Sequence, residues 1–269
     1  MKNVFKLLFL FAVILSLFSC DVNPGTPNRV KVHSSELNDY LTALDENTSE
    51  KPYYIIVSEP NWDEIKTACH NNNYKYVNLA FTDYAGITEV SDFAFSYCYN
   101  LVEIELPEGI SKIGNNAFRF CTGLEKIKIP STVISIGDAA FYYCCALETI
   151  KLPGKLETIG KQGFELCIKL DNIKLPSTIT QIEQNTFFEC PNLRNITIPK
   201  SVIRINEGAF HWCTGLEEII LPGKIEFIDA GAFNFCHKLQ KLSICCEQSL
   251  IDNLNLGGCP NLKEIIILK

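Results

Sequence analysis

The sequence predicts an α/β solenoid, in which about eight short coils stack on one another behind a small N-terminal α/β segment. Eight cysteines recur at intervals of 23 residues, and phenylalanine and leucine recur at the same interval. Apolar residues also alternate within each interval with the period of two that a half-buried strand shows. A fixed period indicates one unit stacked on copies of itself, because a single unit cannot bury its apolar face alone.

The recurring cysteines set the register of the repeat. They are Cys98, Cys121, Cys144, Cys167, Cys190, Cys213, Cys236 and Cys259. Phenylalanine stands three residues before the first seven, and leucine stands three residues after all eight. Three uses of this column are open: disulfides between coils, a stack of metal-binding thiolates, or small side chains that fill the core. Packing is favoured, because equivalent Cβ atoms on stacked strands lie ~4.8 Å apart and a disulfide needs ~3.5–4.5 Å.

After each of these leucines, most copies read Leu-x-x-Ile-x-Leu/Ile-Pro, as in Leu147, Ile150, Leu152 and Pro153. Alternate apolar residues predict a short strand with one buried face. Proline ends the strand, because it has no N–H to donate to a neighbouring strand. We therefore expect this part of each copy to build a parallel β-sheet along one face of the solenoid.

Two further segments complete each copy. A second apolar pair, such as Val133 and Ile136, is followed by glycine in three copies, and we expect a turn there. Before the next strand, residues such as Ala117, Phe118 and Cys121 follow the i, i+1, i+4 spacing of a helix. The expected coil is thus a strand, a turn and one helical turn.

The combined pattern Ala-Phe-x-x-Cys-x-x-Leu-x-x-Ile-x-Leu-Pro-x-x-Ile-x-x-Ile-Gly resembles the BspA-type subfamily of leucine-rich repeats. The resemblance covers residues 91–269 and, with an offset, residues 77–90. It implies an α/β leucine-rich-repeat solenoid, which we assign to residues 82–269. It also implies a bacterial surface antigen that adheres to host matrix or plasma proteins or to other bacteria. The family motif implies no particular binding residue, because it consists of core positions.

The first residues have the layout of a signal peptide, which we assign to residues 1–19. The chain opens with Lys2 and Lys6 and an apolar run over residues 4–18, and this run is shorter than the ~20 residues that span a membrane. Residues 17–20 resemble a bacterial lipobox, which implies lipidation of Cys20. An ordinary cleaved signal is the alternative, because Phe18 departs from the small residue that is common there.

Residues 20–33 are expected to form the lipidated N-terminus and a flexible leash, since they are rich in proline, asparagine and glycine. Residues 34–81 do not repeat, and we expect them to form an α/β capping segment that covers the first coil. The expected elements are a helix from Ser34 with a serine N-cap, a strand over 53–57, a helix over 61–69 capped by Asn61, and a strand over 75–81.

The composition excludes two classes of protein. The apolar fraction of 47% is too high for a disordered chain. Cleavage before Cys20 would remove only two charged residues, both lysines, and so change the formal net charge from −7 to −9. Such an acidic chain is not expected to bind nucleic acid.

The final apolar run, Ile265 to Leu268, predicts an edge strand through which two copies could associate, unless twist and the terminal lysine protect it.

The sequence predicts no catalytic residue, no metal site and no cofactor. It contains no nucleophile elbow, P-loop or zinc-protease signature, and its four histidines are scattered at His33, His70, His211 and His237. His211 and His237 fall in adjacent copies, where a surface pair is favoured over a metal site. An enzyme would require converging groups, such as Glu218 or Glu226 near His211.

Two sets of exposed positions are candidate binding surfaces. The first is a strip of lysines on the outward face of the predicted strands: Lys126, Lys128, Lys151 and Lys174. On an acidic protein this strip could bind an acidic protein surface or a sulfated glycan, or it could be a solvated face. The second is an aromatic set on the convex side: Phe120, Tyr142, Tyr143, Trp212 and Phe235. Aromatic residues are common interface anchors, but these could instead pack between coils.

We therefore expect a lipid-anchored protein of the bacterial cell envelope, exposed on the outer membrane, that binds proteins or glycans through its solenoid. A scaffold that binds a bacterial partner within the envelope or periplasm is the alternative. Both hypotheses fit a leucine-rich-repeat surface, and neither requires catalysis.

Overall fold

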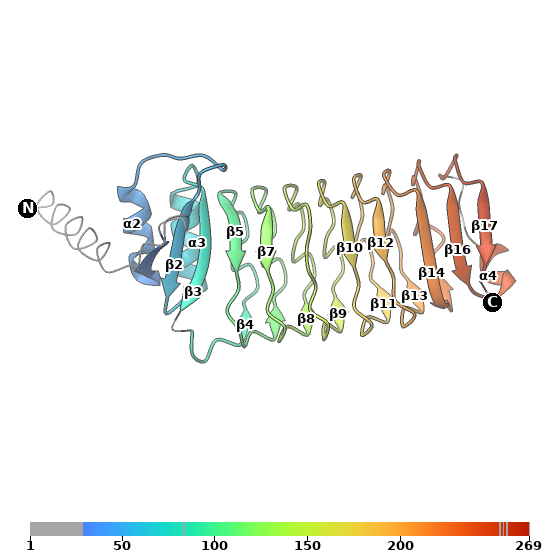
Figure 1. The fold of residues 1–269 in the computed structure, drawn as a ribbon, viewed down its shortest axis with the longest axis horizontal. Coiled ribbons are helices and arrows are strands. Elements are labelled where there is room, and N and C mark those ends of the chain that lie inside the picture. Colours follow the sequence, from blue (N-terminus) through green and yellow to red (C-terminus); the bar gives the residue numbers. More distant parts are fainter. Residues whose placement is uncertain (1–28, 83, 253, 255, 257, 269) are drawn as a thin grey trace, which may run out of the picture.

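The computed structural model describes residues 29–82, 84–252, 254, 256 and 258–268. Within these residues the coils stack along one long axis, with the N-terminal elements at one end and the C-terminal strands at the other (Figure 1). Each strand runs parallel to the strands that it pairs with. The predicted α/β solenoid is confirmed.

The N-terminal segment alternates strands with helices. Its elements are β1 (Arg29–His33), the 3-10 helix η1 (Ser34–Glu36), α2 (Leu37–Ala43), β2 (Tyr53–Ser58), α3 (Trp62–Asn71) and β3 (Val77–Thr82). Residues 29–33, predicted to belong to the leash, instead form β1, which pairs in parallel with β2. The short strand was missed because its polar residues alternate with only two valines. The rest of the leash and the signal segment lie outside the described residues.

The two predicted helix caps have different outcomes. Asn61 caps α3 as predicted, and its side chain accepts hydrogen bonds from the N–H groups of Asp63 and Glu64. The predicted serine cap at Ser34 is wrong. The His33 side chain instead accepts from the Ser35 N–H, because the Ser34 hydroxyl is buried and lies 2.9 Å from the carbonyl oxygen of Glu59.

The strands of the N-terminal segment and of the repeats form one continuous sheet in the order β1-β2-β3-β5-β7. Further strands of the same face form the groups β10-β12 and β14-β16-β17. The bounds are β5 Leu101–Glu105, β7 Lys126–Lys128, β10 Asn172–Lys174, β12 Asn195–Thr197, β14 Glu218–Lys224, β16 Lys241–Cys245 and β17 Glu264–Ile267. Strand β3 pairs with β5, so strands of the N-terminal segment and of the repeats belong to one sheet. The capping role of the segment stays a prediction.

The sheet is interrupted between β7 and β10. The copy between them, which contains Lys151, has no named strand on this face, and one bridge joins Thr149 to Asn172. Its apolar residues Ile150 and Leu152 remain buried, so the coil keeps its place in the stack. The local loss of pairing leaves a shallow groove, which is described below.

The segment predicted to be a turn is instead a second set of short parallel strands. One sheet contains β4 (Glu89–Val90), β6 (Lys112–Ile113), β8 (Ser135–Ile136) and β9 (Thr158–Ile159), and another contains β11 (Gln181–Ile182), β13 (Arg204–Ile205) and β15 (Phe227–Ile228). The glycine that follows some of these strands is needed for close packing. A Cβ on Gly137 would lie 2.7 Å from the backbone nitrogen of Asn115 in the preceding coil.

The predicted helical turn is also wrong, because two residues in most copies have left-handed backbone conformations. Asn116 has a φ of 54° and Phe120 a φ of 59°, which an α-helix does not allow. The N–H of Phe120 donates to the carbonyl of Tyr142 in the next coil, at 2.8 Å. This side of the solenoid is therefore held by hydrogen bonds between coils. A last helix, α4 (Gln248–Asp252), lies before β17.

The core consists of stacked columns of identical residues. The phenylalanine rings from Phe95 to Phe233 are fully buried, and successive ring centroids lie 5.0 to 5.8 Å apart. The eight recurring cysteines, Cys98 to Cys259 at intervals of 23 residues, are buried in the same core, as the packing hypothesis predicts. Residues that share a column therefore occupy equivalent sites in successive coils, and this fixes which positions face the solvent.

Candidate binding surfaces

The lysines of the predicted strip lie on the outward face of the sheet. Lys126 and Lys128 are the end residues of β7, Lys174 ends β10, and Lys151 lies in the copy between these strands. All four side chains are exposed, whereas Ile127 between the first two is buried. The alternation along the chain thus brings the four lysines to one face. Their role in binding stays a prediction.

Lys128 differs from the other three lysines because it has an ion-pair partner. Its Nζ donates a hydrogen bond to Oε1 of Glu105 on the neighbouring strand β5. This hydrogen bond and the charge of Glu105 raise the pKa of Lys128. Within the described part of the chain, Lys126, Lys151 and Lys174 form no ion pair. These three ammonium groups are therefore the ones that an acidic partner could meet.

A groove of about 490 Å³ lies where the sheet is interrupted. It is lined by Thr149, Ile150, Lys151, Leu152, Gly154, Asn172, Lys174 and Pro176. Two of the lysines thus stand on the wall of a depression that also has apolar and amide groups. Sequence analysis did not predict this groove, since the strand pattern is intact at Ile150 and Leu152.

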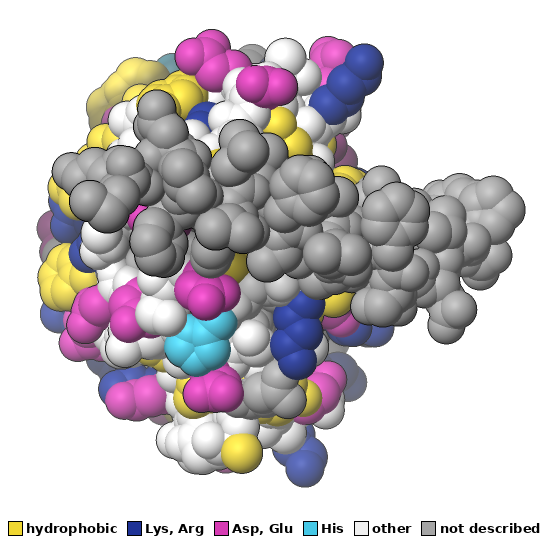
Figure 2. Space-filling model, turned by 90° about the vertical axis from the view of Figure 1, so that its left-hand side faces the viewer, with side chains coloured by type: hydrophobic (Ala, Val, Ile, Leu, Met, Phe, Trp, Pro, Cys, Tyr) yellow, Lys and Arg dark blue, Asp and Glu magenta, His cyan; other side chains and the backbone are white. Residues whose placement is uncertain are grey.

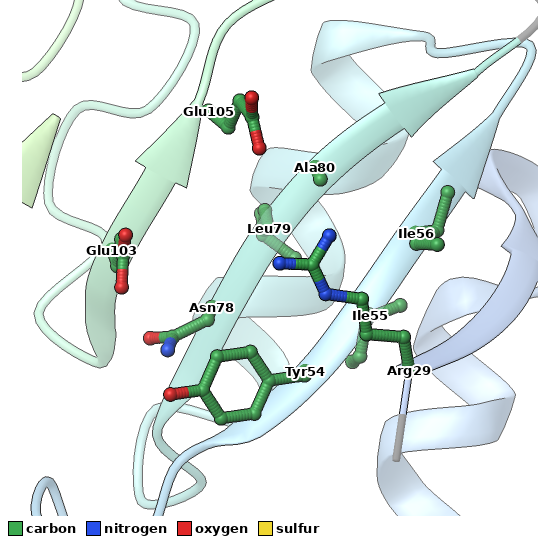
Figure 3. A pocket seen from close by; sticks show the side chains of 9 residues that line it. All are labelled: Arg29, Tyr54, Ile55, Ile56, Asn78, Leu79, Ala80, Glu103 and Glu105. Carbon is green, nitrogen blue, oxygen red and sulfur yellow. The ribbon is translucent and has the colours of Figure 1, made fainter. Parts of the chain in front are cut away.

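A second hollow, of about 80 Å³, lies on the same face at the N-terminal end of the sheet (Figure 3). Arg29 reaches from β1 toward Ala80 on β3, and Asn78, Glu103 and Glu105 lie along the other side (Figure 3). Asn78 is buried, and its Oδ1 has no hydrogen-bond partner within the described residues.

The hollow continues toward the lysine strip. An adjoining depression of about 260 Å³ includes Arg29, Ala80, Glu105 and Lys128 in its lining. The outward face therefore carries an acidic band on β5 followed by the basic strip that starts on β7. Sequence analysis missed the hollow because its outward residues come from N-terminal strands whose register against the repeats was unknown. Seen along the stack from the N-terminal end, acidic and basic side chains both occur around the rim of the molecule (Figure 2).

The aromatic set on the opposite, turn-rich side is partly exposed. Trp212 and Phe235 are each 40% exposed, and Phe120, Tyr142 and Tyr143 are half-buried. The rings also stack on one another: Trp212 lies 4.9 Å from Phe235 with nearly parallel planes. The rings therefore pack between coils, and they still present a face or an edge to solvent. Packing accounts for part of each ring, and its role as an interface anchor stays a prediction.

One aromatic cluster already has its own cation. The guanidinium carbon of Arg119 lies 5.2 Å from the ring centroid of Phe120 and 4.7 Å from that of Tyr142. The ring of Tyr97 stacks on that of Phe120, with centroids 5.0 Å apart. A guanidinium group therefore fits over the rings of this half-buried cluster, where a cation–π interaction contributes about 0.5–2 kcal/mol.

The two histidines of the C-terminal copies flank Phe235. The ring centroids of His211 and His237 lie 5.2 and 6.1 Å from that of Phe235. Burial lowers the pKa of His211, and the charge of Glu189 opposes this shift. In the described ranges, no group of three His, Cys, Asp or Glu side chains is placed to hold a metal ion.

Glu218 and His211, two of the residues that an enzyme hypothesis would bring together, lie in different elements of the coil. Glu218 lies on β14 of the sheet face, where it forms an ion pair with Lys241 at 3.1 Å. His211 stacks on Phe188 in the aromatic cluster, with ring centroids 5.0 Å apart. These groups belong to different faces of the solenoid.

Two further predictions concern the ends of the chain. β17 is the last strand of its sheet, and it exposes Ile265 and Ile267, so edge association stays a prediction. Cys20 lies outside the described residues, and its lipidation also stays a prediction. No helix in the described part of the chain is long and apolar enough to cross a membrane.

Comparisons with known proteins identify the repeat. Residues 53–160 and 135–263 match the family described as the BspA type leucine rich repeat region, in six copies. The chain is similar to a leucine-rich-repeat protein of T. pallidum, with 31% identity and a TM-score of 0.58 over 66% of this chain and 80% of that one. It is also similar to a leucine-rich-repeat protein of Bacteroides ovatus, with 33% identity and a TM-score of 0.56 over 58% of this chain and 40% of that one. No curated protein matches the sequence.

Proposed function

Because this chain belongs to the BspA-type leucine-rich-repeat family, we propose that it binds a partner protein through the outward face of its parallel sheet. The observation that carries the proposal is the set of three exposed, unpaired lysines, Lys126, Lys151 and Lys174, beside the groove in the interrupted sheet. An acidic segment of the partner would meet these ammonium groups.

Charge supports an acidic partner surface. The chain has a formal net charge of −7, so a local basic strip gives the molecule a directional field. Such a strip accelerates association with an acidic surface and orients it. The adjoining acidic residues Glu103 and Glu105 would repel the same surface, and this repulsion would fix its position along the stack.

The groove adds a contact surface that exposed lysines alone do not provide. Exposed lysines on a sheet can serve only to keep a protein soluble, and long-range attraction by itself is weak in physiological salt. The groove between β7 and β10 adds buried contact area and polar groups from Thr149 and Asn172. A partner side chain that enters it would leave water, which strengthens the charge contacts around it.

Binding is tested with a triple charge reversal, Lys126→Glu, Lys151→Glu and Lys174→Glu. Residues 29–269 would be assayed by surface plasmon resonance against immobilised matrix and plasma proteins. We expect binding to a responsive ligand to weaken about tenfold at low salt and the difference to shrink as salt rises to about 0.4 M.

The matched control reverses three exposed lysines away from the sheet strip: Lys161, Lys200 and Lys238. Both triple variants have the same net charge, so a general charge effect would weaken both equally. Equal loss in the two variants, or no loss in the first, would refute the proposed surface. Competition by heparin with no protein ligand found would assign the strip to a sulfated glycan.

We further propose that Cys20 carries a lipid that holds the solenoid at the bacterial surface, where it adheres to host proteins or to other bacteria. The alternative is a scaffold inside the envelope that binds a bacterial partner. Protease treatment of intact cells separates the two. Release of solenoid fragments supports surface exposure, whereas a chain that stays intact until the cells are lysed supports the scaffold.

A further inference from the structure

The exposed aromatic column on the turn-rich side is interrupted in the middle of the solenoid. In successive copies this position holds Tyr97, Phe120, Tyr143, Leu166, Glu189, Trp212 and Phe235. A depression of about 340 Å³ lies beside the interruption and is lined by Ile168, Glu189, Pro191, Trp212 and Thr214. It has apolar walls and one carboxylate.

One face of Trp212 is turned toward this depression. Its other face is covered by Phe235, whose ring lies 4.9 Å away at an interplanar angle of 16°. Because Glu189 occupies the same position one coil earlier, its Cβ lies about 4.8 Å from that of Trp212 along the stack. The indole face and the Glu189 carboxylate therefore border one slot.

The slot has negative charge without an internal counter-ion. Glu189 forms no ion pair within the described residues. Burial lowers the pKa of the nearby His211, which therefore supplies little positive charge at neutral pH.

The same column shows what kind of group fits such a slot. Arg119 covers the rings of Phe120 and Tyr142 with its guanidinium group, as described above. Within the described part of the chain, no cation lies over Trp212 in this way. Tryptophan is the aromatic ring that attracts cations most strongly.

We propose that this slot binds an arginine side chain of a partner protein. The guanidinium group stacks on the free face of Trp212 and pairs with the Glu189 carboxylate, while its methylene groups contact Ile168 and Pro191. A planar guanidinium fits between stacked positions better than a compact ammonium, because it can stack and form hydrogen bonds at its edge. This site shares no residue with the lysine strip and does not depend on it.

The site is tested by NMR on the ¹⁵N-labelled chain of residues 29–269. The probe is the peptide acetyl-Gly-Arg-Gly-amide, and its control is the same peptide with uncharged citrulline. The chain has two tryptophans, so the indole N–H signal of Trp62 serves as an internal reference. We expect the arginine peptide to shift the Trp212 signal saturably and to bind about fivefold more tightly than the citrulline peptide.

Two variants test the assigned contacts. Trp212→Leu removes the ring and introduces the residue that stands at the equivalent Leu166, which has the same left-handed conformation; its binding is followed through backbone signals of Thr214. Glu189→Gln removes the charge, and Glu207→Gln is the matched control on an exposed carboxylate of the next coil. We expect each slot variant to weaken arginine binding about fivefold and the control to leave it unchanged.

Three outcomes would overturn the assignment. Equal affinities for the arginine and citrulline peptides would show that the positive charge of the guanidinium group plays no part in binding. Unchanged affinity in Glu189→Gln would remove the role of the carboxylate. Tetramethylammonium that binds as tightly as the arginine peptide would assign the slot to a small ammonium ion instead.

Discussion

Seven of the eight recurring cysteines, at intervals of 23 residues from Cys121 to Cys259, use the thiol as a hydrogen-bond donor. Cys167 Sγ, for example, donates to the carbonyl oxygen of Phe141 in the preceding coil at 3.2 Å, and the other members repeat this contact at 3.0 to 3.2 Å. The same carbonyl also accepts from the N–H of Cys144. Cysteine is thus suited to the column, because it is small and weakly polar and still has a proton to donate.

Burial of these thiols predicts a loss of stability at high pH. It raises the pKa of Cys121, Cys144, Cys167 and Cys190 above the ordinary value of 9.0, and that of Cys213 to about 12. Above pH ~9 the unfolded chain releases these protons while the folded chain keeps them. The free energy of unfolding should therefore fall as pH rises from ~9 toward the folded pKa values, by up to about 1.4 kcal/mol per pH unit per thiol.

This decline is measured by urea unfolding at several pH values under reducing conditions. Other groups also ionise in this range, so the comparison is with Cys167→Ala, which lacks one buried thiol. The variant should be less stable at pH 7, by about 1–3 kcal/mol, and its stability should fall less steeply above pH 9. Parallel curves for the two proteins would contradict the assigned role of the thiol.

At the scale of one coil, glycine marks the places where neighbouring backbones approach closely. A Cβ on Gly137 would lie 2.7 and 2.8 Å from backbone atoms of Asn115 and Gly114. Gly154, in a loop of the next copy, has no atom within 4 Å of such a Cβ and no positive φ. The two glycines therefore differ in packing within one repeat protein.

We predict that Gly137→Ala lowers the free energy of unfolding by about 1–3 kcal/mol, because the new methyl group forces two coils apart. Gly154→Ala should change it by no more than about 1 kcal/mol, and in the stabilising direction, because alanine restricts the unfolded chain. Urea unfolding monitored by circular dichroism gives both values. A Gly137→Ala protein as stable as the parent would show that the coils can separate without cost.

The turn-rich side shows why element type was mispredicted within a correctly predicted coil. Ala117, Phe118 and Cys121 have helical spacing, and all three are buried as a helix would bury them. Nevertheless the N–H of Phe118 donates to Ala140 of the next coil at 2.8 Å. The spacing of apolar residues within one copy cannot predict a hydrogen bond to a neighbouring copy.

At the scale of the whole molecule, the proposed anchor and the two binding surfaces form one arrangement. A lipid on Cys20 would hold the chain at the end of the solenoid that carries the N-terminal segment. The solenoid would then extend from that end, with the lysine strip and the Trp212 slot on different sides. Partners could bind to both surfaces at once, because the surfaces share no residue.

The anchor predicts where the protein is found in cells. Cys20→Ala should move the chain from the detergent phase to the aqueous phase in Triton X-114 partition, because the only proposed lipid site is lost. A change at the partly buried Cys145 serves as the control, since it removes a cysteine from the solenoid and should leave partition unchanged. An unmodified Cys20 in the mature protein, seen by mass spectrometry, would contradict lipidation.

Residue spacing was sufficient to predict the stack, its register, the buried columns and the exposure of the four lysines. These features follow from recurrence, since each copy must bury its phenylalanine, cysteine and leucine against the same residues of its neighbours. The same register also placed Trp212 and Phe235 in one column. Helix α3 and strand β2 were predictable from local sequence, because Asn61 caps the helix and an apolar run forms the strand.

Contacts between copies decided the rest. The interruption of the sheet at Thr149, the depression beside Trp212 and the hollow under Arg29 depend on how neighbouring side chains and backbones meet across coils. The identity of a residue does not specify these distances, because the same Leu-x-x-Ile-x-Leu pattern occurs in paired and in unpaired copies. The periodic residues thus predict which positions face outward, and three-dimensional packing alone shows where those positions form a groove or a slot.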